Sequence, residues 1–251
     1  MAKKYVNNES FNSSVSVDCV ILGFDGKDLN LLLIRRESNS TRKGIDDYKL
    51  PGSLIYESEE LESAAYRVLE NMTGLSNIFL EQLQVFSNPN RVKGDDLKWL
   101  NSYYGIQTNR VITVAYYSLL KLDDKIRRFT LRKGAVWRPI DSVKRLGLDH
   151  KEIATSAIST ITSKFFQSPI AFELLPKRFT IRQLQTLYEA VIGTELDSRN
   201  FRKKITNLGY LEATGEREKN VAHKPAQYYT FNRIKYEKER KNSNKISRLY
   251  F

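Results

Sequence analysis

The chain has 251 residues, 41% of them hydrophobic and 28% charged, and a formal net charge of +12. This hydrophobic content excludes an intrinsically disordered protein, and the length is enough for one large domain or two modest ones, each with its own core. The single cysteine excludes an intrachain disulfide, and no apolar run is long enough to span a membrane. We therefore expect a cytoplasmic protein that does not contact the membrane.

The first half of the chain predicts a series of strands. Two apolar, β-branched runs, 15–23 and 29–34, flank Asp25 and Gly26, a pattern typical of a β-hairpin. Cys19 lies in the first run, where a buried small hydrophobe is its expected role. The polar stretch 35–47 indicates a loop. Further strands are predicted at 80–86, 110–120 and 135–138.

A second polar stretch, 88–107, is long and contains Trp99, Tyr103 and Tyr104. A loop of this length either folds over a ligand pocket or packs its own aromatic side chains at the surface. The sequence leaves both interpretations open.

Residues 51–75 predict the most clearly marked helix. Ser58 is suited to be its N-cap, and Glu59 and Glu60 favour the positive end of the helix dipole. Gly74 supplies the left-handed residue that ends the helix. Apolar residues at helical spacing form one stripe: Leu61, Ala64, Ala65, Val68, Leu69 and Met72.

This stretch resembles the Nudix box, whose pattern is G-x5-E-x7-R-E-U-x-E-E-x-G-U with U an apolar residue. Pro51 and Gly52 match the usual lead-in, Glu59 matches the first glutamate, and Arg67 matches the arginine. Three later positions also match, namely Leu69, Gly74 and Leu75.

Four positions depart from the pattern. Ser53 replaces the first glycine, and Val68, Asn71 and Met72 replace glutamates that hold Mg²⁺ or Mn²⁺ in Nudix hydrolases. Such cations need several oxygen ligands, and valine and methionine supply none. Glu70 points about a hundred degrees of helix turn away from these positions. The resemblance therefore implies a Nudix-like αβα sandwich with a mixed sheet, for which we expect no catalytic residue, no metal and no cofactor.

A further helix is predicted at 149–166. Asp149 and Glu152 form a capping-box pattern, and His150 is interpreted as a residue of the helix N-terminus that makes local hydrogen bonds. One face carries the apolar residues Ile153, Ala157, Ile161 and Phe165.

The C-terminal part holds most of the charge. Residues 177–251 include 17 Lys and Arg against 8 Asp and Glu, which is +9 of the total of +12. Charge asymmetry of this size points to a polyanionic partner, and its alternative is an ordinary solvated surface.

The element order in this part is that of a winged helix-turn-helix. Helices are predicted at 170–175, at 180–192 with a Thr180–Gln183 capping box and a stop at Gly193, and at 198–208 with Asp197 as its cap. Strands follow at 210–213 and 227–231, around a basic loop.

The helix at 198–208 is predicted to enter the major groove of DNA. Phe201, Ile205 and Leu208 lie on its inner side. Its candidate DNA-binding residues are Ser198, Arg199, Asn200, Arg202, Lys203 and Thr206. The basic loop adds Arg217, Lys219 and Lys224, with Asn220 and His223 between them.

The run FELLPKRFTIRQLQTLYEAVIGTELDSRNFRKKI resembles the NrtR family of bacterial transcriptional regulators, and with the Nudix-like part the resemblance covers nearly the whole chain. It implies a homodimer that binds a palindromic operator on double-stranded DNA and responds to a small effector. Some members respond to ADP-ribose or related NAD metabolites, and others control sugar catabolism, including L-arabinose use. Because the box has lost the carboxylates of a metal–diphosphate site, a sugar or sugar nucleotide is favoured as the effector.

We therefore expect a repressor of a catabolic operon that senses a sugar such as L-arabinose. Its parts are a Nudix-like effector domain (1–167), a winged helix-turn-helix (168–231) and a basic tail (232–251), which is either a frayed helix or disordered. The alternative is an active Nudix pyrophosphohydrolase acting on ADP-ribose or a related compound. In a Nudix fold the ligand lies between the box loop and the sheet, which makes Tyr56, Glu59, Arg91, Trp99 and Asn101 the candidate effector-binding residues.

Overall fold

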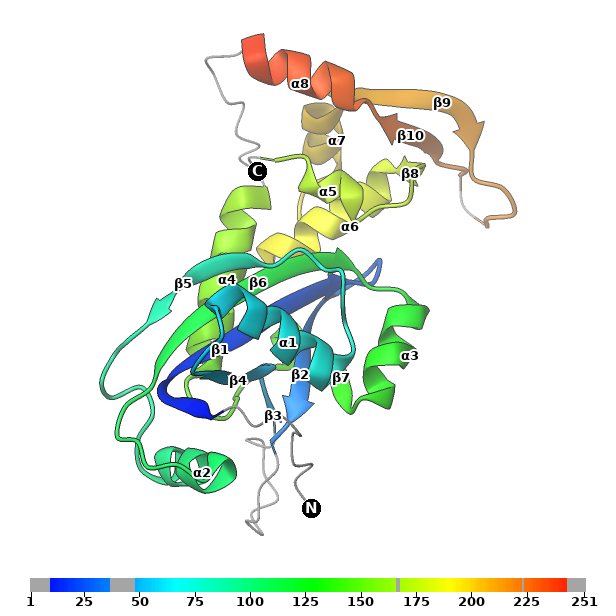
Figure 1. The fold of residues 1–251 in the computed structure, drawn as a ribbon. Helices are drawn as coiled ribbons and strands as arrows, with labels where there is room; N and C mark the ends of the chain where they lie inside the picture. Colours follow the sequence, from blue (N-terminus) through cyan, green and yellow to red (C-terminus); the bar gives the residue numbers. More distant parts are fainter. Residues whose placement is uncertain (1–9, 37–47, 166–167, 223, 243–251) are drawn as a thin grey trace. The chain divides into compact units, whose positions relative to one another are not determined.

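The structure is a computed structural model that describes residues 10–36, 48–165, 168–222 and 224–242 (Figure 1). Its contacts divide the chain into two compact units. The first comes mainly from residues up to Ala157, and the second from Ile158 onward together with Phe24–Leu29 and Leu120–Leu122. Within the described ranges, no helix is long and apolar enough to cross a membrane.

A seven-stranded sheet forms the centre of the first unit, with the order β3-β2-β1-β6-β5, β4 paired to β1, and β7 paired to β2. The predicted hairpin is confirmed: β1 and β2 are neighbours, and the side chain of Asp25 accepts hydrogen bonds from the backbone N–H groups of Lys27 and Asp28. The strands are β1 (Phe11–Phe24), β2 (Leu29–Arg35), β3 (Tyr48–Lys49), β4 (Gly52–Tyr56), β5 (Glu81–Phe86), β6 (Ile112–Lys121) and β7 (Ala135–Pro139).

The segment from β3 to β4 pairs with two different strands. At its start, Lys49 pairs with Ile34 of β2. At its end, Gly52 pairs with Asp18 of β1, next to a hydrogen bond from Cys19 N to the carbonyl of Pro51. The segment therefore leaves β2 for β1 at Leu50–Pro51, and this places Lys49 and Gly52 close to Asp18.

The box helix α1 (Leu61–Thr73) confirms the predicted stripe, because Ala64, Ala65, Val68 and Leu69 are all buried. Gly74 ends the helix with a φ of 76°. The predicted N-cap is wrong, since the helix begins at Leu61 with Glu60 at the N-cap position. The carboxylate of Glu59 accepts hydrogen bonds from Tyr56 N and Arg67, so the residues before the helix are fixed by this pair and not by Ser58.

Two helices were not predicted. The stretch expected to be a loop contains α2 (Asp95–Tyr104), which lies between two glycines with positive φ, Gly94 and Gly105. The other is α3 (Asp124–Arg132), in which Ile126, Phe129 and Thr130 have helical spacing and Thr130 is the buried residue.

The two faces of the sheet are covered by different helices, as in the expected αβα sandwich. Neighbouring residues of a strand point to opposite faces. Cys19 contacts the carbonyl of Ala65 in α1, whereas Asp18 faces His150 at the start of α4 (His150–Phe165). The predicted stripe of α4 is confirmed: Ile153, Ala157, Ile161 and Phe165 are buried.

The second unit has the predicted order of a winged helix. A three-stranded sheet has the order β8-β10-β9, and the Thr180–Gln183 capping box, the stop at Gly193 and the Asp197 cap are all confirmed. Two boundaries differ: α5 ends early, and β9 continues to Arg217. In the tail, the helix alternative holds for α8, and residues 243–251 lie outside the described residues. The elements of this unit are α5 (Ile170–Glu173), β8 (Phe179–Thr180), α6 (Ile181–Ile192), α7 (Ser198–Asn207), β9 (Leu211–Arg217), β10 (Gln227–Phe231) and α8 (Arg233–Asn242).

Candidate functional site

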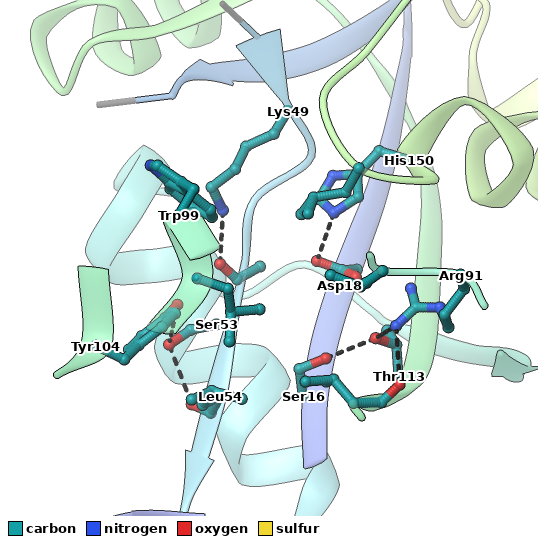
Figure 2. A pocket seen from close by; sticks show the side chains of 15 residues that line it. Ser16, Asp18, Lys49, Ser53, Leu54, Arg91, Trp99, Tyr104, Thr113 and His150 are labelled. Carbon is teal, nitrogen blue, oxygen red and sulfur yellow. Dashed lines mark hydrogen bonds and ion pairs between the residues drawn. The ribbon is translucent and has the colours of Figure 1, made fainter. Parts of the chain in front are cut away.

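A pocket opens in the first unit where β1, the β3–β4 segment, α2 and the start of α4 meet (Figure 2). Its cavity volume is about 30 Å³, far below the roughly 300–1,000 Å³ of typical small-molecule sites, so it must widen before it can take a ligand. We call it the polar pocket. The polar and aromatic side chains that line it are Ser16, Asp18, Lys49, Ser53, Arg91, Trp99, Tyr104, Thr113 and His150.

Asp18 and His150 form the deepest part of the polar pocket. The Nδ1 atom of His150 accepts a hydrogen bond of 2.8 Å from Leu50 N, so the ring proton is on Nε2, which lies 3.6 Å from Oδ1 of Asp18. Burial lowers the pKa of His150 to about 3 and raises the pKa of Asp18. His150 is therefore a neutral donor at physiological pH. Its interpretation as a residue with local hydrogen bonds is wrong, because its partners lie on distant strands.

Gly52 makes room for the Asp18 carboxylate. A Cβ atom at Gly52 would lie 1.6 Å from Oδ1 of Asp18. No side chain larger than hydrogen fits beside this carboxylate without displacing it.

Lys49 supplies a buried amine to the polar pocket. Its Nζ donates hydrogen bonds to the carbonyls of Gly52, at 2.7 Å, and Leu50, at 3.4 Å. Burial lowers the pKa of Lys49 to about 8, against the opposing effect of Asp18. The group remains mostly protonated at neutral pH, so it donates hydrogen bonds.

Arg91 connects the polar pocket to the residue before α4. Its Nε and Nη2 atoms each lie 2.7 Å from a carboxylate oxygen of Asp149, and its Nη1 donates to Thr113 Oγ1 at 2.5 Å. Thr113 in turn shares a hydrogen bond of 2.6 Å with Ser16. The predicted capping residue Asp149 thus directs its carboxylate to Arg91.

Aromatic side chains of α2 form one wall. Trp99 stacks on Tyr103 with ring centroids 5.1 Å apart, and Tyr104 donates to Ser53 Oγ at 3.1 Å. The stretch packs its own aromatic rings, as one interpretation has it, and it also lines the polar pocket, whose role as a ligand site stays a prediction. The guanidinium of Arg36 lies 4.3 Å from the centre of the Trp99 ring. The Nε atom of Arg36 is buried and has no hydrogen-bond partner among the described residues.

The Nudix box itself borders a second, smaller hollow. Its lining includes Tyr56, Arg67, Asn71 and Met72. Arg67 forms an ion pair of 2.5 Å with Glu59 and lies 4.2 Å over the Tyr56 ring. These residues do not fit the metal of a Nudix hydrolase. Throughout the described residues, no group of three or more His, Cys, Asp or Glu is placed to hold a metal ion.

The predicted effector residues are distributed unevenly. Arg91 and Trp99 line the polar pocket, and Tyr56 lines the smaller hollow. Glu59 is held by Arg67, and Asn101 exchanges hydrogen bonds with the backbone of Thr108, so neither lines a pocket. Their roles remain predictions. Sequence reasoning missed Asp18, Lys49 and His150, although a charged residue inside an apolar strand such as Asp18 is a signal that could have been used.

In the second unit, α7 presents its predicted DNA-binding residues to solvent. Phe201 and Ile205 are fully buried and hold the helix to its unit, and Leu208 is half-buried. The turn before α7 is fixed by Gln185 and Glu189, which bind the backbone of Leu196. All six predicted residues of the helix are exposed: Ser198, Arg199, Asn200, Arg202, Lys203 and Thr206.

The loop between β9 and β10 carries the remaining predicted contacts. Its base is closed by a hydrogen bond from Glu218 N to the carbonyl of Ala226. Arg217 donates to the carbonyl of Pro225, and Lys219 and Lys224 are exposed. His223 lies outside the described residues. Among the described residues, no ion pair holds Arg199, Arg202 or Lys203 of α7, so these cations are available to phosphate groups.

Comparison with known proteins gives consistent results for both units. Residues 171–231 match the family described as NrtR DNA-binding winged helix domain. The chain is 26% identical to the ADPR responsive transcriptional repressor NtrR of Acinetobacter baylyi over 91% of its own length and 86% of the relative.

Two solved structures share the fold. NrtR of Shewanella oneidensis in complex with a 27mer DNA has a TM-score of 0.61 and 23% identity, covering 89% of this chain and 95% of that one. A MutT/nudix family protein from Enterococcus faecalis has a TM-score of 0.58 and 23% identity, with coverage of 90% and 89%. The predicted fold, a Nudix-like α/β domain followed by a winged helix, is confirmed.

Proposed function

We propose that the chain, whose Nudix-like domain is followed by a match to the NrtR winged helix, is an NrtR-type regulator that represses a catabolic operon and responds to a small effector. The observation that carries this proposal is α7, an exposed helix with a buried anchor of Phe201 and Ile205 and three cations that form no ion pair with any described residue. A helix of this kind is suited to the major groove, with the wing on the neighbouring backbone. The named relative is itself a repressor.

The repressor acts as a homodimer on a palindromic operator. Two copies of α7 related by a dimer axis read half-sites about one or two turns of duplex apart. Arg199, Arg202 and Lys203 contact phosphates and base edges, while Lys219 and Lys224 contact the backbone beside them.

The effector binds in the polar pocket and is a small polyhydroxylated molecule, with L-arabinose as the first candidate. The charges of the pocket are balanced, since Lys49 and Arg91 are accompanied by Asp18 and Asp149. A neutral sugar offers hydroxyl groups that both donate and accept hydrogen bonds, which suits carboxylate, amine and imidazole together. Trp99 supplies an apolar platform, and the pocket, with a cavity volume of about 30 Å³, widens to admit the sugar.

ADP-ribose is the second candidate, because the Acinetobacter relative is named for its response to it. Its diphosphate adds negative charge to a pocket whose cations already have carboxylate partners. In this case Arg36, whose Nη1 pairs with Asp96 at 2.6 Å while its buried Nε has no hydrogen-bond partner, is the phosphate contact.

The Nudix-like domain is not a hydrolase in this proposal. Val68, Asn71 and Met72 supply no carboxylate to a metal, and the carboxylate of Glu59 is engaged by Arg67. Release of AMP from ADP-ribose at ordinary enzyme rates with Mg²⁺ or Mn²⁺ present would refute this part.

DNA binding is tested by fluorescence anisotropy with a labelled duplex from the region upstream of the gene. We expect selective binding that weakens steeply with salt, because each neutralised phosphate releases counterions. Arg199→Ala/Arg202→Ala should lose selectivity and affinity. The matched control is Lys125→Ala/Arg128→Ala on α3, which removes the same charge from the other unit. Equal DNA affinity and selectivity in the two double variants would show that α7 does not recognise the operator.

Effector choice is tested by thermal shift with L-arabinose, other pentoses and hexoses, and ADP-ribose. A ligand of the folded state raises the melting temperature, and at 100 times its Kd it stabilises by about 2.7 kcal/mol. A response to ADP-ribose alone would replace the sugar by the nucleotide. If neither the sugars nor ADP-ribose raise the melting temperature, the polar pocket is not the effector site proposed here.

A further inference from the structure

Helix α4 links the polar pocket to the second unit through the chain itself. It begins at His150 and ends at Phe165, and the division between the two units falls within it, between Ala157 and Ile158. Its last turns belong to the second unit, where Thr162 binds the carbonyl of Val191 and the Phe165 ring lies 5.0 Å from Tyr188. The two units therefore share residues of one helix.

The start of α4 is held at the polar pocket by side chains rather than by a cap. Asp149 is bound by two nitrogens of Arg91, and His150 accepts a hydrogen bond from Leu50 N. Leu148, just before them, has a φ of 59°, a left-handed conformation that side chains other than glycine, asparagine and aspartate rarely adopt. Contacts on either side keep this loop in a conformation that its sequence alone disfavours.

Arg91 lines the polar pocket, and its fork of Nε and Nη2 is occupied by Asp149. Arginine pairs with two oxygens at a time through this fork, whether they belong to a carboxylate, a phosphate or neighbouring hydroxyl groups. A ligand in the pocket that binds Nε and Nη2 of Arg91 must displace the carboxylate of Asp149. The ligand and the start of α4 thus compete for one guanidinium.

We propose that Asp149 is the positioning residue that couples effector binding to DNA binding, an inference that rests on the function proposed above. In the effector-free protein the Arg91–Asp149 pair fixes the first turn of α4 in the form that binds the operator. The effector binds Arg91, so that the carboxylate of Asp149 is released. The first turn of α4 and the residue before Asp149, Leu148, then change position. Affinity for the operator then falls.

The test uses the full chain without any small molecule, and the upstream duplex as the probe. Asp149→Asn should imitate the effector and weaken DNA binding by about 5–150-fold, the usual range of coupling between sites. Asp149→Glu, which keeps a carboxylate, should restore most of the affinity. The dependence of affinity on salt should stay that of the wild type, because the phosphate contacts of α7 are unchanged.

A buried arginine left without its partner can unfold the domain, so a second variant is needed. Arg91→Met/Asp149→Leu removes both charges and should show the same loss of DNA affinity with a native circular dichroism spectrum. Glu152→Gln is the matched control, since it removes one charge from the same turn at an exposed side chain. It should bind DNA as the wild type does.

The inference is overturned if both Asp149→Asn and Arg91→Met/Asp149→Leu bind the duplex with wild-type affinity. It is also overturned if Glu152→Gln loses as much DNA affinity as Asp149→Asn. A wild-type protein that does not bind the duplex would instead refute the proposed function, and the inference with it. The two failures are therefore distinguishable.

Discussion

Replacing Gly52 by alanine tests the packing on which the polar pocket depends. The new Cβ would lie 1.6 Å from Oδ1 and 2.7 Å from Cγ of Asp18, and 3.0 Å from the carbonyl oxygen of Val17. The backbone of Gly52 does not lie in the left-handed region, so alanine adds no conformational strain there. Asp18 must move, and overpacking of this kind costs about 1–3 kcal/mol. In the Asp18→Ala background the two closest atoms are gone and only the 3.0 Å contact with the carbonyl oxygen of Val17 remains, so Gly52→Ala should cost much less than in the wild type.

The measurement is urea unfolding of the four proteins of this cycle, followed by tryptophan fluorescence. Both tryptophans, Trp99 and Trp137, belong to the first unit, so the signal reports that unit alone. We expect a coupling of about 1–3 kcal/mol between positions 18 and 52. If Gly52→Ala costs the same in both backgrounds, the carboxylate does not occupy the space that the structure assigns to it, and the reasoning fails.

Three further predictions concern other parts of the chain. The pKa of His150 is about 3 in the folded protein against 6.5 in the unfolded chain, so the unfolded chain takes up the proton first and stability falls as the pH drops below 6.5. Between pH 7.5 and 5 the wild type should lose about 2 kcal/mol more than His150→Gln in urea titrations, and equal losses would contradict the assignment. Asp18, whose raised pKa acts in the opposite direction, is common to both proteins. Phe201→Ala should cost about 3–5 kcal/mol in the second unit, seen as an early loss of helical circular dichroism while tryptophan fluorescence is retained. Finally, adding Mn²⁺ should leave the melting temperature unchanged, and a rise of several degrees would indicate a metal site that the box residues do not explain.

Local patterns in the sequence were sufficient for the elements whose signals are local. The stripe of α1, the stop at Gly74 and the caps at Thr180 and Asp197 depend on residues within one or two turns, and all are confirmed. Helix α3 was not predicted although Ile126, Phe129 and Thr130 have helical spacing, because this stripe covers little more than one turn among charged residues. In the structure Thr130 donates to the carbonyl of Ile126 and accepts from Trp137, and the Phe129 ring lies beside Gly74.

The N-cap of α1 failed for a related reason. Ser58 has the right chemistry and spacing, but the ion pair of Glu59 with Arg67 fixes the preceding turn and delays the helix to Leu61. A side-chain pair between residues eight positions apart outweighs a capping preference, which contributes only about 1 kcal/mol.

The missing metal ligands of this Nudix-like helix follow from the sequence alone, because no fold can supply a carboxylate to a valine or a methionine. The basic helix and its apolar anchor residues follow from the sequence as well. The residues that form the polar pocket follow only from the tertiary structure. Leu50 and His150 are 100 residues apart, and Asp18 becomes a pocket residue only because the β3–β4 segment crosses from β2 to β1 beside it. Contacts of this kind depend on strand register and chain crossing, which leave no periodic trace in the sequence.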